Sequence, residues 1–138
     1  GGLFIRDNIR KSWMIIPKST YLVGQYYERK ALNYLRQQGL KLIERNVRYP
    51  CGEIDLIMQG NRTWIFVEVR FRRSAQFGDA ISSVTYSKRR RLWYAANCWL
   101  AQRQQSIETV NCRFDICAFD QRQLIWLKNI LDHTEFIR

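Results

Sequence analysis

Histidine is almost absent from this chain of 138 residues, since His133 is the only one and stands beside Asp132 in a polar tail. A histidine-dependent catalytic triad or zinc cluster therefore has almost no material to be built from. Long apolar runs are absent as well, because no segment approaches the roughly 18 residues of a membrane span. The sequence thus predicts no integral membrane segment.

Cysteine is scarce too, with four residues in the chain. Cys112 and Cys117 fall in one predicted strand at an odd spacing, so their side chains are expected on opposite faces. Cys51 adjoins another predicted strand and Cys98 lies in a predicted helix, so we do not expect the four thiols to converge on a metal. Because the sequence shows no secretory signal, we expect small buried thiols in a reducing cytoplasm.

Acidic residues are outnumbered, with 12 Asp and Glu against 23 Lys and Arg and a formal net charge of +11. Such an excess predicts an anionic partner, and we expect nucleic acid, in particular DNA. Residues 62–103 hold nine basic side chains but only Glu68 and Asp79 as acids, so the positive charge is concentrated. An ordinary solvated face is the alternative interpretation.

Two regions are distinguished by composition. Residues 1–20 alternate short apolar islands with basic residues, and we interpret them as an arm that packs on the domain or on a second copy. A helix lying on a membrane surface is the alternative. Residues 21–138 are expected to form one α/β domain, because 46% hydrophobic and 14% aromatic residues are enough to build a core.

Apolar spacing predicts two helices separated by strands. The first covers residues 21–38 and ends at Gly39, and the second follows a loop that ends in an N-cap at Thr85. Apolar residues stripe this second helix at Leu92, Ala95, Ala96, Trp99 and Leu100. Strands are predicted over residues 41–47, 52–57, 66–70, 111–119 and 124–129. A helix between strands of one sheet indicates an α/β sandwich with mixed strand directions.

Two strands in the middle of the chain carry carboxylates, which are costly to bury. Because strand side chains alternate, Glu53 and Asp55 are expected to share one face of their strand, with Ile54 and Leu56 on the other. Glu68 and Arg70 likewise share one face of the following strand.

The connection between these strands sets the distance between the carboxylates. A two-residue turn at Gly60-Asn61 would pair Asp55 with Phe66 and make Glu68 its diagonal neighbour, with Cβ atoms roughly 7–8 Å apart. Two carboxylates at that spacing can hold one hard divalent cation. Arg70 would then supply a fixed positive charge where a phosphate could bind.

A run of four cations opens the second predicted helix. The residues Lys88, Arg89, Arg90 and Arg91 oppose the helix macrodipole, which is unfavourable unless an anion binds there. Together with Arg72 and Arg73 across the loop, they are interpreted as a phosphate clamp. Tyr86 or Trp93 could stack on bases, and core packing is the alternative for Trp93.

These residues match a known pattern. Asp55, Glu68 and the basic Arg70 resemble the PD-(D/E)xK nuclease core. Over about residues 21–132 the chain is similar to the YraN family of small bacterial proteins. The similarity is carried by Gly24-x-x-x-Glu28-x-x-Ala31, Gly52-Glu53-Ile54-Asp55-Leu56-Ile57, Phe66-Val67-Glu68-Val69, Val84-Thr85-x-x-Lys88 and Arg113-Phe114-Asp115.

The resemblance implies a three-layer α/β/α sandwich with a mixed central sheet, restriction-endonuclease-like or Holliday-junction-resolvase-like. It implies that Asp55 and Glu68 bind Mg²⁺ or Mn²⁺, with Glu28 of the first helix in the same acidic cluster. A solvent-exposed or salt-bridged Glu28 is the alternative. Arg70 replaces the lysine of related nucleases, and a guanidinium stabilises charge but cannot act as a general base. For Asp115 we expect a pair with a nearby arginine.

Three functions follow from these observations. The first is a metal-dependent endonuclease acting on DNA, including branched or recombination and repair intermediates, for which a homodimer would suit a two-armed junction. The second, favoured by Arg70, is a catalytically weak or inactive nucleic-acid-binding module that retains the nuclease fold. The third is a structural role in a larger complex, suggested by the apolar arm.

Overall fold

The computed structural model describes residues 20–72, 82–120 and 123–136. Its elements are helix α2 (Thr20–Gln37), strands β1 (Lys41–Tyr49), β2 (Gly52–Gly60) and β3 (Thr63–Arg72), helix α4 (Tyr86–Ala101), strands β4 (Cys112–Asp120) and β5 (Gln123–Leu127), and the 3-10 helix η1 (His133–Phe136). The order of helices and strands is the one that the sequence predicts. The arm over residues 1–19, Arg73 and most of the loop before Thr85 lie outside the described residues.

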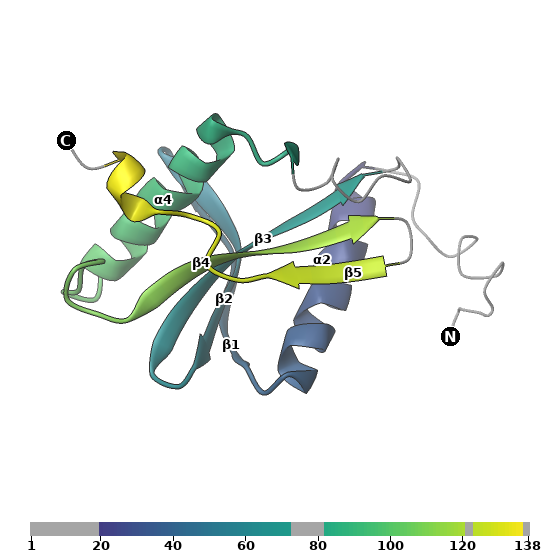
Figure 1. Cartoon of the computed structure of the whole chain (residues 1–138), viewed down its shortest axis with the longest axis horizontal. Coiled ribbons are helices and arrows are strands. Elements are labelled where there is room, and N and C mark those ends of the chain that lie inside the picture. The colour runs from purple at the N-terminus through teal and green to yellow at the C-terminus, as the bar shows by residue number, and fades with distance from the viewer. Residues whose placement is uncertain (1–19, 73–81, 121–122, 137–138) are drawn as a thin grey trace, which may run out of the picture.

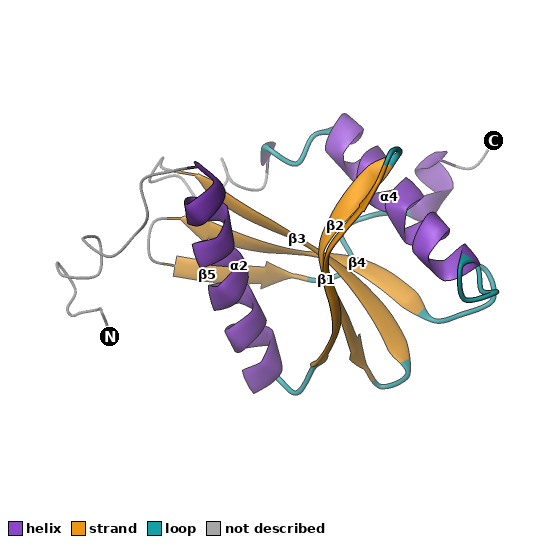
Figure 2. Cartoon of the chain, turned by 180° about the vertical axis from the view of Figure 1, so that it is seen from behind, coloured by secondary structure: helices purple, strands orange, loops and turns teal. Residues whose placement is uncertain are grey.

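The five strands form one sheet in the order β1-β2-β3-β4-β5. β3 and β4 run parallel while the other neighbours are antiparallel, so the predicted mixed sheet is confirmed. The parallel pair requires a crossover, and α4 provides it. The two helices cover opposite faces (Figure 1), and in Figure 2 the curved strands β1 and β2 run between them. The fold is therefore an α/β sandwich of three layers.

Each face of the sheet has its own hydrophobic core. Beneath α2, Tyr27, Ala31 and Leu35 pack against a cluster that includes Ile65 and Val67. Beneath α4, the residues that define its predicted stripe are all buried, and they pack against a cluster that includes Ile57, Phe66 and Phe114. Neighbouring residues of β3 thus point to opposite helices, as strand alternation requires.

The sequence correctly places the cap at the C-terminal end of α2 and the cap at the N-terminal end of α4. Gly39 has a left-handed φ of 95°, and the amides of Gly39 and Leu40 donate to the carbonyls of Arg36 and Leu35, which is a Schellman motif. The Thr85 hydroxyl accepts a hydrogen bond from the Lys88 amide at 3.2 Å and caps the start of α4. The Thr85 cap fixes the end of α4 that carries Lys88 to the site.

The predicted turn between β2 and β3 is wrong by one residue. Gly60 pairs with Thr63, so the turn residues are Asn61 and Arg62, both with positive φ, as in a type I′ turn. The strand register therefore moves by two residues from the expected one, and a shift by an even number of residues does not by itself exchange the faces of the strand. The last regular pair is Leu56 with Val67. Asp55 and Glu68 come immediately after it, opposite each other rather than diagonal.

The predicted shared face of Ile54 and Leu56 is also wrong. Ile54 belongs to the core beneath α4, whereas Leu56 belongs to the core beneath α2. The strand pair bends here, because Asn46 of β1 has a left-handed φ of 54°. The bend carries the start of β2 toward α4, where Gly52 lies against the backbone of Arg91.

The expectation of buried thiols is wrong for three of the four cysteines, and the sequence did not predict that two of them touch. Cys112 packs against the α4-side core and Cys117 lies in the α2-side core, so they do occupy opposite faces. Cys51 and Cys98, however, have their Sγ atoms 3.5 Å apart. Only Cys117 is fully buried. The contact arises because the bend in β2 brings its first residues against α4, which local spacing cannot predict.

Candidate functional site

A cavity of about 600 Å³ opens between α2, the sheet and the N-terminal end of α4. It is lined by Val23, Gly24, Tyr27 and Glu28 of α2, Arg48 of β1, Glu53 and Asp55 of β2, Glu68, Val69, Arg70 and Phe71 of β3, and Lys88 of α4. All four residues predicted to be catalytic therefore line one cavity, together with one of the predicted nucleic-acid-binding residues. Gly24 leaves the cavity wall open, since nothing lies within 4 Å of a Cβ placed there.

Asp55 and Glu68 form the acidic floor of this cavity. Asp55 Oδ2 accepts a hydrogen bond of 2.8 Å from the Val69 amide, so its side chain takes over where the backbone pairing of β2 and β3 stops. Burial raises the pKa of Asp55 above its ordinary value, and burial together with the charge of Asp55 raises the pKa of Glu68 to about 8. Two carboxylates placed this way repel each other when both are ionised.

The same pair fits a hard divalent cation. Carboxylate oxygens are the ligands that Mg²⁺ and Mn²⁺ prefer, and bringing a dication between the two groups would relieve their repulsion. Among the described residues, no three His, Cys, Asp or Glu side chains converge closely enough to hold a metal ion. An ion here would therefore have two protein carboxylates and take its remaining oxygens from water or phosphate, which is the usual arrangement for Mg²⁺.

Arg70 is held beside this pair. Its Nη1 lies 3.4 Å from Glu68 Oε2, and its Nε donates to the Ser83 hydroxyl at 3.1 Å. Its Nη2 also lies 3.5 Å from the Ser83 carbonyl oxygen. The guanidinium is thus a hydrogen-bond donor held in position beside the acidic pair.

Glu28 faces the site from α2. The side-chain amide of Asn46, turned so that its nitrogen faces the carboxylate, donates to both oxygens at 3.0 and 3.2 Å. Burial and the charge of Asp55 raise the pKa of Glu28 to about 7, while Arg45 and Arg48 partly oppose the increase. The left-handed backbone of Asn46 is what presents its amide to α2. The structure therefore places Glu28 near the acidic pair, in hydrogen-bonding contact with β1.

The structure separates the four cations that open α4. Lys88 lines the cavity. Burial raises the pKa values of Asp55 and Glu68, and the charge of Lys88 opposes part of that increase. Arg91 forms a 2.7 Å ion pair with Glu53, and that hydrogen bond lowers the pKa of Glu53.

The other two cations of the run lie away from the cavity. Arg89 donates to the Val84 carbonyl and pairs with Glu135 of η1 at 3.1 Å. Arg90 is exposed and lies over the ring of Tyr94. The four cations of the predicted phosphate clamp therefore do not point to one place: one lines the cavity, two pair with protein acids and one is exposed. The side chain of Arg72 and all of Arg73 lie outside what the structure describes.

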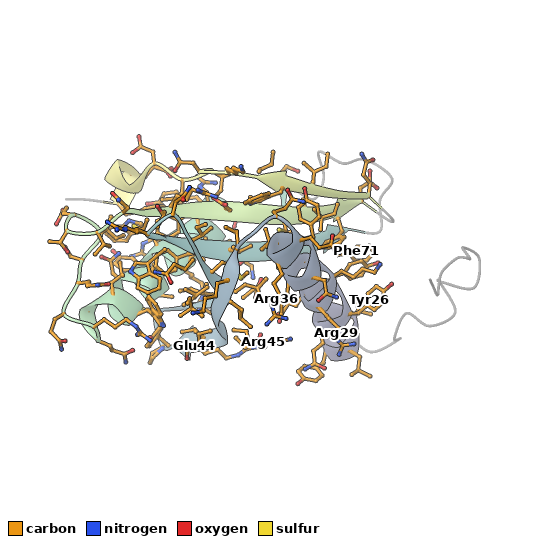
Figure 3. All side chains as sticks on the ribbon, turned by 90° about the horizontal axis from the view of Figure 1, so that it is seen from below. Tyr26, Arg29, Arg36, Glu44, Arg45 and Phe71 are labelled. Atoms are coloured by element: carbon orange, nitrogen blue, oxygen red, sulfur yellow. The ribbon has the colours of Figure 1, made fainter. Side chains whose placement is uncertain are left out.

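Sequence reasoning missed the cations and the amide supplied by β1. Arg48 lines the cavity opposite α4, and Asn46 holds Glu28. Pairing β1 with β2 across the Pro50-Cys51 turn would have placed Arg48 opposite Glu53, as the register shows. Figure 3 labels further arginines that do not line the cavity, Arg29 and Arg36 on α2 and Arg45 on β1. The cations that line the cavity are Arg48, Arg70 and Lys88.

Asp115 is a structural residue away from the cavity. It is fully buried in β4 and accepts hydrogen bonds from Arg113 Nε, from Trp126 Nε1 and from the Asn129 amide. The expected pair with an arginine is confirmed, and the two further donors show that Asp115 ties β5 and the segment after it to β4.

Among the described residues, no helix is long and apolar enough to cross a membrane.

Comparisons with known proteins relate the chain to one family. A family model described as "Uncharacterised protein family UPF0102" matches residues 27–119. A UPF0102 protein of Photorhabdus laumondii is 51% identical over 126 residues, which cover 91% of this chain and 100% of the relative. A UPF0102 protein of Yersinia enterocolitica is 54% identical over 106 residues, which cover 77% of this chain and 91% of the relative. The matched region includes Glu28, Asp55, Glu68, Arg70 and Lys88.

Proposed function

This chain belongs to the uncharacterised protein family UPF0102, the YraN family that its motifs resemble, and from its site we propose that it is a divalent-metal-dependent endonuclease acting on DNA. Asp55 and Glu68 would hold Mg²⁺ or Mn²⁺. Branched recombination or repair intermediates are the substrates that the resemblance to resolvases suggests, and such substrates would favour a homodimer.

One observation carries the proposal: two like-charged carboxylates with raised pKa values share a cavity that is bordered by cations. Structural acids are paired with cations or amides, as Asp115 and Glu53 are here. An acidic pair whose pKa values stay raised although the Val69 amide and Arg70 contact it is typical of a binding or catalytic site. A divalent ion bound there would polarise a phosphoryl oxygen and lower the pKa of a bound water.

The other cavity residues have complementary chemistry. Arg70 can stabilise the charge that develops on the phosphoryl group during attack. Lys88 brings an ammonium group to the same cavity from α4, where it can bind a phosphate. Glu28, with a pKa of about 7, can exchange a proton near neutral pH. The cavity thus places three cations, Arg48, Arg70 and Lys88, beside its acids.

The cations around the cavity favour binding that depends on charge rather than sequence. Arg48 and Lys88 line the cavity and can contact phosphates of a strand that crosses it. No base-reading motif accompanies them. Binding is therefore expected to be sequence-tolerant and to weaken steeply with salt, and Arg48→Ala should reduce the salt slope by about one.

A nucleic-acid-binding module with weak or no catalysis is the second candidate. The observation in its favour is that the nuclease lysine is replaced by Arg70, whose guanidinium is held by Glu68 and Ser83. Such a protein would keep the cavity, the cations and the binding of DNA but would not hydrolyse it.

Cleavage assays on branched, duplex and single-stranded DNA with Mg²⁺ or Mn²⁺ separate the two functions. We expect the parent to cleave, Asp55→Asn to lose both cleavage and Mn²⁺ binding by calorimetry, and the matched control Glu108→Gln, an exposed acid, to lose neither. Arg70→Lys should cleave faster if a titratable amine is needed at that position, and equally or more slowly if only fixed charge is needed. If neither the parent nor Arg70→Lys cleaves any substrate while both bind DNA, the protein is the binding module.

A further inference from the structure

Two thiols lie in contact outside the cavity. Cys51 Sγ and Cys98 Sγ are 3.5 Å apart although the residues are separated by 47 positions in the chain. Both cysteines are free and partly exposed. A disulfide bond is about 2.05 Å long, so the two sulfurs need to approach by only about 1.5 Å to form one.

The surrounding contacts hold the two cysteines near each other. Cys51 immediately precedes β2, and Cys98 lies two helical turns after Arg91, on the same face of α4. Arg91 in turn pairs with Glu53, two residues after Cys51. Between these contacts, a Cβ added to Gly52 would lie 2.6 Å from the carbonyl carbon of Arg91, so the strand and helix backbones already touch. Side-chain rotation rather than backbone movement can therefore bring the sulfurs together.

We propose that Cys51 and Cys98 are a redox modification site, which forms an intramolecular disulfide by exchange with a small-molecule disulfide such as glutathione disulfide. One cysteine thiolate attacks a sulfur of the reagent, forming a mixed disulfide and releasing one thiol. The second cysteine then loses its proton and attacks the protein sulfur of that mixed disulfide, which releases the second thiol. The protein loses two electrons and two protons, and one reagent disulfide becomes two thiols.

The contact between the sulfurs places each cysteine where it can attack a mixed disulfide on the other. The other two cysteines suit this chemistry poorly. Burial raises the pKa of Cys117 to about 12, and burial also raises the pKa of Cys112. Exchange should therefore be selective for the Cys51 and Cys98 pair.

The disulfide would connect two elements that carry site residues. β2 contributes Glu53 and Asp55 to the cavity, while α4 contributes Lys88. A covalent bond between them restricts how far α4 can separate from the sheet, and the loop that it closes is long enough to stabilise the fold considerably. This modification does not depend on the protein being a nuclease.

The test compares the full chain after incubation with dithiothreitol or with glutathione disulfide. Intact mass should fall by about 2 Da, two hydrogens, and proteolytic mapping should recover a peptide that joins Cys51 to Cys98. The oxidised protein should melt on the order of 10 °C higher than the reduced protein. Cys98→Ser and Cys51→Ser should each abolish the loss of mass and the rise in melting temperature, whereas the control Cys112→Ser should keep both.

Three results would overturn the proposal. These are a stable mixed disulfide with glutathione on Cys51 and no internal bridge, a bridge that uses Cys112 or Cys117, and no change of mass over hours in excess reagent. Each is read on the parent protein, so the test remains decisive even if a serine variant folds poorly.

Discussion

Replacing Glu68 with glutamine should stabilise the metal-free protein at high pH. Glu68 is a buried carboxyl whose pKa rises from 4.5 to about 8 on folding, because burial and the charge of Asp55 disfavour its ionised form. Glutamine has the same shape and keeps an oxygen for Arg70 Nη1, but it carries no charge to be buried. The variant therefore removes the electrostatic cost and little else.

The sign follows from proton linkage. Below pH 4.5 Glu68 is protonated in both the folded and the unfolded chain and its ionisation costs nothing. Between pH 4.5 and about 8 the unfolded chain releases the proton while the folded chain retains it, so stability falls as the pH rises. Once the pH exceeds about 8 the accumulated loss is at most about 5 kcal/mol, part of which is shared with Asp55 because the two groups titrate together.

The assay is urea denaturation in the presence of a chelator at pH 5, 7 and 9. We expect Glu68→Gln to match the parent at pH 5 and to exceed it by several kcal/mol at pH 9. Glu53→Gln is the matched control on the same cavity wall. Arg91 lowers the pKa of Glu53, so this carboxylate stabilises the fold above its unfolded pKa, and its neutral variant should be less stable than the parent at pH 7 and pH 9.

The reasoning is refuted if the parent and Glu68→Gln lose stability in parallel from pH 5 to pH 9. Other groups that titrate above pH 8 are common to both proteins, so the difference between them isolates Glu68. Adding Mn²⁺ at pH 9 provides a separate reading of the metal proposal, because the ion should raise the stability of the parent more than that of Glu68→Gln.

Two other substitutions test the contacts that hold β5 against β4 and α4 against β2. Asp115→Ala should cost about 3–5 kcal/mol in urea denaturation, because it leaves Arg113, Trp126 Nε1 and the Asn129 amide without their buried acceptor. A loss below about 1 kcal/mol would show that β5 is held by other contacts. Gly52→Ala should cost at least about 2 kcal/mol, because the new methyl group collides with the backbone of Arg91 and must displace α4. An unchanged melting temperature would mean that the helix can move away freely.

Much of the fold was predictable because the local signals agree with one another. The helix stripe from Leu92 to Leu100, the left-handed Gly39 and the N-cap at Thr85 each depend on a few neighbouring residues, and all three are confirmed. The turn at Asn61-Arg62 was missed because positive φ at arginine is unusual, and Gly60 offered a more ordinary choice. This error did not exchange the faces of the strands, since the register moved by an even number of residues, whereas the opposite faces of Ile54 and Leu56 come from the bend in the strand.

The sequence alone determined which chemical groups the site contains: acids on two adjacent strands, an arginine in place of a lysine, and an excess of cations. Only the tertiary structure decided which of these charged groups line the cavity and which pair with one another. It directed Lys88 into the cavity while Arg91 and Arg89 pair with protein acids, and it brought Arg48 and Asn46 to the site from β1.

It also placed Cys51 against Cys98. The physical reason is the bend at Asn46, together with the packing of Gly52 on α4. Both set distances between segments far apart in the chain, and periodicity carries information only about neighbours within one segment.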